Sequence, residues 1–301
     1  RTGCLHGYAM SRFAASLLSL SITLALSPAL AAPPADAPTF DPQRLSEMVK
    51  TLSADDFDGR GPATAGEKKT IDYVTAQMQA AGVQPGGDVQ EDGTRAWTQA
   101  VPLLRSDIAG EPTLSVTVDG KPRALSQGEE IAVRAAMDGS ESVEITDAPI
   151  VFVGYGVTAP ERDWDDFKGV DLTGKVALVL VNDPDYETGD GDFGGKAMTY
   201  YGRWTYKYEE AARQGATGML VIHETAPASY GWATVKNSNT NTMFDVVREN
   251  PSDTHPQMEG WIQRDFAVEL FKNAGLDFEA LKKQAQTRDF KPVELEGQTF
   301  S

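Results

Sequence analysis

Residues 199–235 read TYYGRWTYKYEEAARQGATGMLVIHETAPASYGWATV and predict a helix that leads into a buried strand. The helix has an apolar stripe with a 3.6-residue period, made of Trp204, Tyr208, Ala211, Ala212 and Gly215. Gly215 and Gly218 can adopt the left-handed conformation that ends a helix. The run 219–222, MLVI, is then typical of a strand that is covered on both faces.

A second strand of the same kind precedes this helix. Residues 175–182, KVALVLVN, are apolar without alternation. Because two such strands flank one helix, the sequence predicts an α/β layer. Further strands are predicted at 97–104, 113–118, 150–153 and 291–300, with helices after Asp41, at 67–81 and within 263–287. Asp119-Gly120 is a hairpin signal.

The amino-terminal residues have the pattern of a secretory signal. Arg12 precedes an apolar run over 13–26, and residues 29–31 fit the small-x-small cleavage rule. We expect residues 10–31 to be a signal peptide, residues 1–9 an upstream extension, and the protein to be exported to the periplasm or beyond the cell. A membrane anchor is the alternative, but the run is short for a span, so no stable membrane association is expected after signal removal.

The chain is strongly acidic, with 27 basic against 44 acidic residues and a formal net charge of −17. Such a surface repels nucleic acid and anionic lipid, so neither is an expected partner. The single cysteine, Cys4, lies in the leader. The mature chain is therefore expected to have no disulfide and to depend on the burial of its core.

Few side chains of the mature sequence suit catalysis. Its histidines, His223 and His255, lie in no H-x-x-E-H, H-E-x-x-H or H-x-D motif, so no zinc cluster is recognisable. A G-x-S-x-G nucleophile elbow is absent too. His223 beside Glu224 could be a metal ligand or a base, but we favour a strand-end histidine whose ring is satisfied by a backbone carbonyl.

An acidic loop follows the strand at 175–182. Its carboxylates are Asp183, Asp185, Asp190 and Asp192. Oxygen ligands at alternate positions could bind calcium. The glycine and the terminal glutamate of an EF-hand loop are misplaced, so we favour a solvated acidic loop over a calcium site.

Aromatic residues are dense between 200 and 232. They are Tyr200, Tyr201, Trp204, Tyr206, Tyr208, Tyr230 and Trp232. Aromatic side chains are favoured at ligand-facing surfaces, but they also pack helices onto sheets. Helical spacing favours packing for Trp204 and Tyr208. We expect Tyr230 and Trp232 to lie in a loop and to shape a substrate site.

These stretches resemble a known domain. FVGYGV at 152–157, DDFKGVDLTGKV at 165–176 and residues 200–232 are similar to the protease-associated domain inserted in secreted bacterial zinc aminopeptidases, relatives of glutamate carboxypeptidase II. Residues 52–85, with Gly59-Arg60 and Ala65-Gly66, resemble the first helices of the same peptidase domain. The similarity extends over residues 40–301.

The resemblance implies an α/β fold in which a protease-associated domain, β-rich with flanking helices, is inserted into the start of a zinc-peptidase α/β sandwich that is incomplete here. The expected parts are a Pro/Ala-rich linker at 32–40, the amino-terminal part of the peptidase domain at 41–106, the protease-associated domain at 107–289 and the start of a returning peptidase strand at 290–301.

The resemblance also implies peptide hydrolysis with two zinc ions, which histidines, aspartates and glutamates bind, and with a glutamate as general base. The first family ligand belongs to an H-x-D motif beyond the insert. No catalytic or metal residue can therefore be carried over to residues 1–301, and we expect this fragment to be inactive alone. Without the rest of the sandwich, we expect exposed apolar faces and unpaired strand edges in residues 41–82, 97–104 and 291–300. The fragment is therefore expected to be poorly soluble outside the protease-associated part.

Two functions follow as hypotheses. The first is the front part of an exported zinc aminopeptidase, with the protease-associated domain as a lid or specificity element whose acidic surface and aromatics receive the amino termini of peptide or protein substrates. The alternative is a non-catalytic peptide- or protein-binding module. The predicted peptidase helices disfavour this module, and they also disfavour another protease class with the same insert. The sequence decides neither the preferred substrate residue nor the oligomeric state.

Overall fold

A computed structural model of the protein describes residues 39–301, which divide into two compact units between Thr98 and Gln99. This division comes earlier than the boundary after residue 106 that the sequence predicts. The predicted upstream extension (1–9), signal peptide (10–31) and residues 32–38 of the linker lie outside the described residues. In the described part of the chain, no helix combines the length and apolarity that a membrane span requires.

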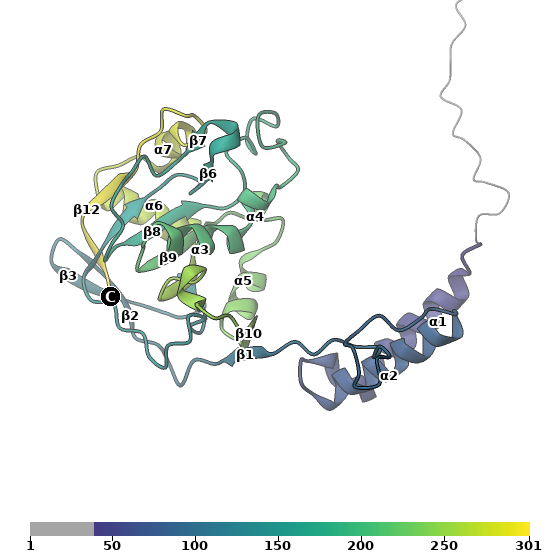
Figure 1. Ribbon diagram of the computed structural model, residues 1–301. Coiled ribbons are helices and arrows are strands. Elements are labelled where there is room, and N and C mark those ends of the chain that lie inside the picture. The colour runs from purple at the N-terminus through teal and green to yellow at the C-terminus, as the bar shows by residue number, and fades with distance from the viewer. Residues whose placement is uncertain (1–38) are drawn as a thin grey trace, which may run out of the picture. The chain divides into compact units, whose positions relative to one another are not determined.

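Over its described residues, 39–98, the first unit is built on two helices, α1 (Pro42–Leu52) and α2 (Ala65–Ala80), joined by a 3-10 segment at Asp55–Arg60 (Figure 1). Asp41 caps α1 by accepting hydrogen bonds from two backbone amides, as the sequence predicts. Apolar side chains of both helices remain exposed, among them Leu45 (51%), Val49 (65%) and Met78 (45%). The predicted exposed apolar faces are confirmed for these helices.

The second unit holds all the strands of the described residues. They are β1 (Leu103–Ser106), β2 (Leu114–Val118), β3 (Lys121–Leu125), β4 (Ile131–Val133), β5 (Ala148–Phe152), β6 (Thr158–Ala159), β7 (Trp164–Asp165), β8 (Val176–Leu180), β9 (Gly218–His223), β10 (Met243–Val246), β11 (Met258–Gln263) and β12 (Val293–Phe300). Its helices are α3 (Trp204–Arg213), α4 (Thr225–Ala228), α5 (Trp232–Asn239), α6 (Arg264–Asn273) and α7 (Phe278–Gln284). Short 3-10 turns lie at Pro160–Arg162, Tyr200–Gly202 and Pro251–Asp253.

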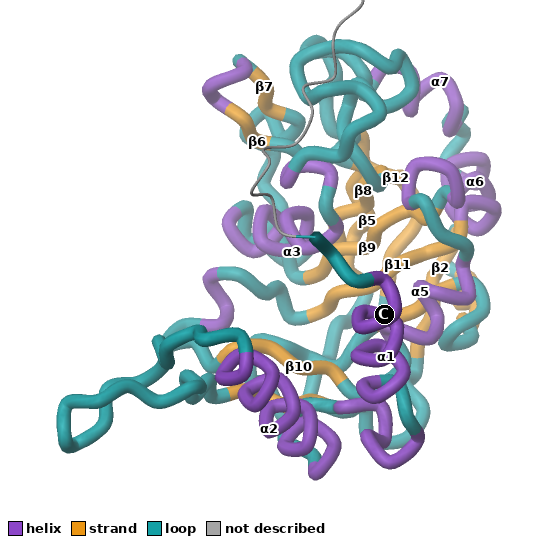
Figure 2. The backbone as a smooth tube through the Cα atoms, turned by 90° about the vertical axis from the view of Figure 1, so that its right-hand side faces the viewer, coloured by secondary structure: helices purple, strands orange, loops and turns teal. Residues whose placement is uncertain are grey.

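An eight-stranded mixed sheet organises this unit, in the order β3-β2-β12-β5-β8-β9-β11-β4. The central strands β5, β8, β9 and β11 are parallel, and the outer neighbours pair antiparallel. Helix α3 lies on one side of the strands and helices α6 and α7 lie on the other (Figure 2). The predicted α/β layer is confirmed.

The sheet has a separate core on each face. Leu178 and Leu180 of β8 pack on the side of Phe266 and Phe271 from α6, whereas Val179 packs with Tyr208 and Ala211 from α3; these two sets belong to different clusters of buried residues. Both faces of β8 and β9 are therefore covered, which explains their continuous apolar sequences.

Two expectations about the sheet are wrong. Strand β12 does not lack partners, because it pairs with β2 on one side and with β5 on the other. It also joins the sheet whose other strands lie in 107–289, rather than a separate peptidase sheet. The strand predicted at 97–104 is displaced to β1. This strand pairs with β10 in a two-stranded ribbon, rather than belonging to an incomplete peptidase sandwich.

The hairpin between β2 and β3 forms at the predicted turn. Asp119 and Gly120 both have positive φ angles, 47° and 74°. Two such residues in sequence make the tight turn whose twist matches that of paired strands. The register follows, with Val118 opposite Lys121 and Leu114 opposite Leu125.

Candidate functional site

The carboxyl ends of two parallel strands bring the candidate site together. His223 is the last residue of β9 and Gln263 is the last residue of β11, and the two are register partners. Polar residues follow each strand directly, Glu224 after β9 and Arg264 after β11. Ligands of α/β folds characteristically bind outside the carboxyl ends of parallel strands.

A cleft of about 430 Å³ lies at this position. Its lining consists of Glu187, His223, Glu224, Thr225, Ala226, Pro227, Trp232, Gln263, Arg264 and Asp265. All of these residues belong to the second unit, so the cleft is formed within it. Its size is suited to a side chain or a short piece of peptide rather than to a large cofactor.

His223 is bonded as the sequence predicts. The residue is 5% exposed, and its Nε2 lies 2.9 Å from the backbone oxygen of Tyr230. Burial lowers the pKa of His223, although the hydrogen bond to Tyr230 and the charge of Glu224 oppose this effect. The prediction of a strand-end histidine satisfied by a carbonyl is confirmed.

Aromatic rings surround this histidine. Tyr230 stacks on it with ring centroids 6.1 Å apart, and Trp232 and Trp261 meet it edge-on at 5.7 and 6.0 Å. The indole Nε1 of Trp232 donates to the carbonyl oxygen of Gly128 at 2.9 Å, which fixes the ring. Burying one aromatic ring against another adds to the stability of such a cluster.

The two predicted substrate-shaping residues have different positions. Trp232 lines the cleft, whereas Tyr230 is not among the lining residues and packs against His223 and Trp261. Tyr230 lies between α4 and α5, in a loop as expected. Trp232 is the first residue of α5 instead of a loop residue, because the sequence after Gly231 starts a helix.

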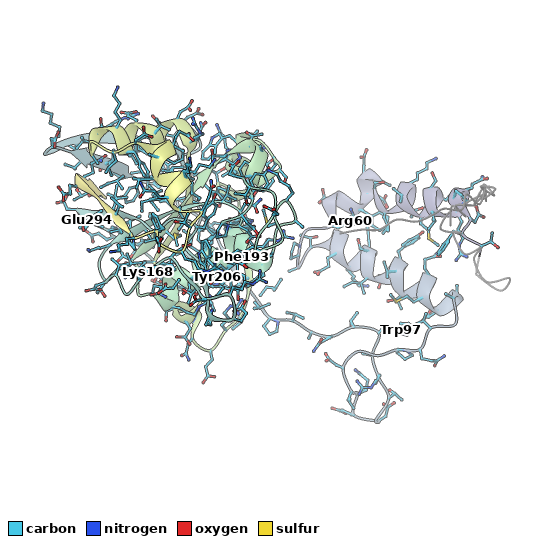
Figure 3. The ribbon with its side chains drawn as sticks, turned by 90° about the horizontal axis from the view of Figure 1, so that it is seen from above. Arg60, Trp97, Lys168, Phe193, Tyr206 and Glu294 are labelled. Atoms are coloured by element: carbon cyan, nitrogen blue, oxygen red, sulfur yellow. The ribbon has the colours of Figure 1, made fainter. Side chains whose placement is uncertain are left out.

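The other aromatic residues of this segment pack the helix and its neighbours. Tyr208 is buried and donates to the carbonyl oxygen of Gly260 at 3.1 Å, and its ring meets Trp204 at 5.6 Å. The expectation that these two residues pack is confirmed. Tyr201 contacts Tyr206 at 5.0 Å and Phe193 at 5.8 Å; the latter two are labelled in Figure 3.

Charged groups pair with carboxylates that line the cleft. The Lys282 ammonium lies 2.7 Å from a carboxylate oxygen of Glu187 and 2.8 Å from one of Glu224. Arg264 approaches Glu224 at 3.4 Å and also pairs with Glu279. Burial lowers the pKa of Lys282, but its bonds to the two carboxylates outweigh that effect and raise the pKa.

Sequence reasoning did not single out Glu187, Gln263, Arg264 or Lys282. The first lies in a glycine-rich loop, and the others lie at a strand end or on helices with ordinary surface patterns. Position at the end of a buried strand, for Gln263, or directly after it, for Arg264, is the one local signal that could have indicated these residues.

The acidic loop does not gather its carboxylates at one point. Asp183 accepts hydrogen bonds from the backbone nitrogen and the hydroxyl of Thr199, at 2.6 and 2.8 Å. Asp185 accepts from the backbone nitrogen of Phe193 at 2.8 Å, and Asp192 pairs with Arg288. The loop is therefore held by separate contacts rather than only solvated. Among residues 39–301 no group of three or more His, Cys, Asp or Glu side chains is placed to hold a metal ion.

A buried lysine fixes the neighbouring strand ends. Lys207 of α3 is fully buried, and its ammonium donates to the carbonyl oxygens of Tyr155 and Asn182 at 2.5 and 3.1 Å. These residues follow β5 and β8. Burial lowers the pKa of Lys207, whereas the charges of Asp183 and Asp166 act to raise it. Burial raises the pKa of Asp166 in turn.

Comparisons with known proteins give limited matches. No model of a known protein family matches the chain, and no curated protein matches it. Two similar solved structures are an aminopeptidase from Aneurinibacillus sp. strain AM-1 (15% identity, TM-score 0.33) and BSAP, a zinc aminopeptidase from Bacillus subtilis (14% identity, TM-score 0.29). Each match covers 87% of this chain and 46% of the other, so the chain spans about half the length of these aminopeptidases. Identities and scores this low do not by themselves establish a shared fold.

Proposed function

We propose that this chain is the amino-terminal part of an exported zinc aminopeptidase, whose second unit is a protease-associated domain that selects peptide substrates. The observation that carries the proposal is the cleft at the carboxyl ends of β9 and β11, where Trp232 and His223 form an aromatic wall next to charged side chains. Clefts that combine apolar walls with a few polar groups are the usual sites of small ligands and peptide side chains.

Under this proposal, the zinc ions are bound by residues other than those that the structure describes. The two-zinc site of the resembled family does not fit residues 39–301, because no described group of three metal-ligating side chains comes together. We therefore assign the second unit a part in binding and orienting substrate, and no step of hydrolysis to its side chains. The proposed partner is a peptide or protein, whereas the charge of −17 disfavours nucleic acid.

The coding sequence after Ser301 provides the first test. A continuing frame that encodes an H-x-D motif and a Glu-Glu pair supports the proposal, and a genuine stop codon at that position counts against it. The enzyme from the continuing frame is then assayed on aminoacyl substrates with and without a chelator. Chelator-sensitive cleavage by the 301-residue product alone would contradict the proposal that residues 39–301 bind substrate but no catalytic zinc.

A second candidate function is a non-catalytic peptide-binding module. It is favoured by the completeness of the cleft within the second unit and by the place of β12 inside the same sheet. This candidate predicts peptide binding without hydrolysis, together with a stop codon directly after Ser301. Calorimetry with short peptides on the 301-residue product, combined with an assay for new amino termini, distinguishes the two functions.

A further inference from the structure

We infer that the cleft beside His223 binds a positively charged group of a peptide, either its amino-terminal ammonium or a basic side chain. The inference deepens the proposed function and rests on it for the identification of the cleft as the substrate-selecting site. It depends on the hydrogen-bond acceptors that the cleft leaves free, on its aromatic wall and on its charge.

The first free acceptor is the imidazole of His223. A backbone carbonyl cannot donate a proton, so the contact between Nε2 and the Tyr230 oxygen requires the hydrogen on Nε2. In the neutral ring Nδ1 then has a lone pair and no hydrogen. Nδ1 has no hydrogen-bond partner in the described part of the chain, although the residue is only 5% exposed and lines the cleft. An acceptor without a partner on a residue that lines a cleft favours a ligand that donates a hydrogen bond.

The second free acceptor belongs to Gln263. Its Nε2 donates to the carbonyl oxygen of Glu129 at 2.7 Å, which fixes the orientation of the amide. The amide oxygen is left to accept, and no partner for it occurs within residues 39–301. Because His223 and Gln263 are register partners on adjacent strands, about 4.8 Å apart, both acceptors can serve one ligand group.

The aromatic wall and the charged lining of the cleft also favour a positively charged ligand. Trp232 presents an indole ring, which is the best aromatic face for a cation. The lining includes three carboxylates, those of Glu187, Glu224 and Asp265, against the single guanidinium of Arg264. Asp265 is 97% exposed in its side chain and, among residues 39–301, forms an ion pair only with Arg264, at 3.7 Å. Its charge is available to an incoming cation.

An anionic ligand is disfavoured by the same contacts. Lys282 is bound to Glu187 and Glu224, and Arg264 is bound to Glu224 and Glu279. Lys282 therefore has two carboxylate partners, and Arg264 has three when Asp265 at 3.7 Å is included. An anion would have to replace bonds that the protein makes to itself, whereas a cation finds acceptors without partners.

The test is a calorimetric titration of the full chain with three short peptides. Gly-Ala-Ala amide offers only an amino-terminal ammonium, acetyl-Ala-Lys-Ala amide offers only a side-chain ammonium, and acetyl-Ala-Gln-Ala amide offers neither. We expect binding of at least one charged peptide and weaker or no binding of the neutral one. The comparison between the first two peptides identifies the source of the charge.

Two variants locate the binding. Asp265→Asn should weaken binding of the charged peptide about two- to fivefold, the range of an exposed ion pair. Asp289→Asn removes one exposed charge that does not line the cleft and should leave binding unchanged. Trp232→Leu should weaken binding by a similar two- to fivefold factor through the lost cation–π contact, about 0.5–1 kcal/mol. Circular dichroism verifies that each variant is folded.

The inference is overturned if no charged peptide binds, if the neutral peptide binds equally well, or if Asp265→Asn and Asp289→Asn behave alike. Its failure is distinguishable from that of the proposed function. If the enzyme from the continuing frame cleaves peptides but the cleft binds charged and neutral peptides equally, the proposed function stands and the inference is refuted. If the coding sequence stops after Ser301 and the chain still binds charged peptides selectively, the inference stands and the proposed enzymatic function is refuted.

Discussion

The imidazole Nδ1 of His255 lies 2.7 Å from a carboxylate oxygen of Glu259, a residue that is 3% exposed inside β11. The other ring nitrogen lies 2.9 Å from Asp245 of β10. The histidine therefore joins the β1–β10 ribbon to strand β11 of the main sheet. Arg134 approaches Glu259 at 3.3 Å, and Arg248 approaches Asp245 at 3.1 Å.

This contact predicts a pH-dependent stability. Burial lowers the pKa of His255, but the hydrogen bonds and charges of Glu259 and Asp245 outweigh it and raise the pKa above 6.5. The protonated ring therefore stabilises the fold fully below about pH 6.5, and this contribution is lost as the pH rises through the folded-state pKa. His255→Gln should lower the free energy of unfolding by about 1–3 kcal/mol near pH 6 and by less near pH 9.

His223 provides the comparison for this measurement. Its pKa is lowered by burial, so the fold loses stability as the pH falls through the unfolded-state value. Thermal melts of His223→Gln and His255→Gln across pH should therefore show stability differences from the wild type with opposite slopes. Equal slopes would contradict the assigned charge states.

Lys207→Met should destabilise the second unit strongly. The change leaves the buried carboxylates of Asp183 and Asp166 without their cation, and the carbonyl oxygens of Tyr155 and Asn182 without a donor. Leaving a buried charge without compensation costs about 3–5 kcal/mol. Denaturant unfolding followed by tryptophan fluorescence measures the loss. Lys283→Met, an exposed change on α7, should have little effect, and a similar loss in both variants would refute the assigned role.

Gly66→Ala should disrupt the first unit. A Cβ at this position would lie 2.1 Å from the backbone oxygen of Phe57, whose ring packs on Tyr73 at 6.4 Å. Overpacking of this kind costs about 1–3 kcal/mol. Gly61→Ala is the control, because its Cβ would meet only a methyl group at 3.5 Å. Limited proteolysis of residues 41–82 should be faster for the first variant alone, and equal rates would contradict the close contact.

Val49→Lys should reduce aggregation of the chain. Val49 is 65% exposed on α1, so the change removes exposed apolar surface without opening a cavity. Ser46→Lys adds the same charge to the same helix and removes no apolar side chain. Light scattering at equal concentration should show slower aggregation of the first variant than of the second. Equal rates would mean that this apolar face does not drive association.

Several elements could be predicted because their causes are local. Continuous apolar residues define β8 and β9, and Asp41 and Asp277 cap α1 and α7 with their own side chains. The sequence does not predict strand β11, because Glu259 interrupts its apolar run. In the structure, contacts with His255 and Arg134 offset the cost of burying the Glu259 carboxylate.

The sequence by itself determined helix α3, the buried strands β8 and β9 and the carbonyl-bonded His223, because residues a few positions apart decide periodicity, caps and turns. Only the tertiary structure decided that β12 pairs between β2 and β5, that Lys282 meets Glu187 and Glu224, and that Gln263 lies beside His223. These contacts join residues far apart in the chain. Their partners are chosen by packing, register and charge in three dimensions, which no local pattern encodes.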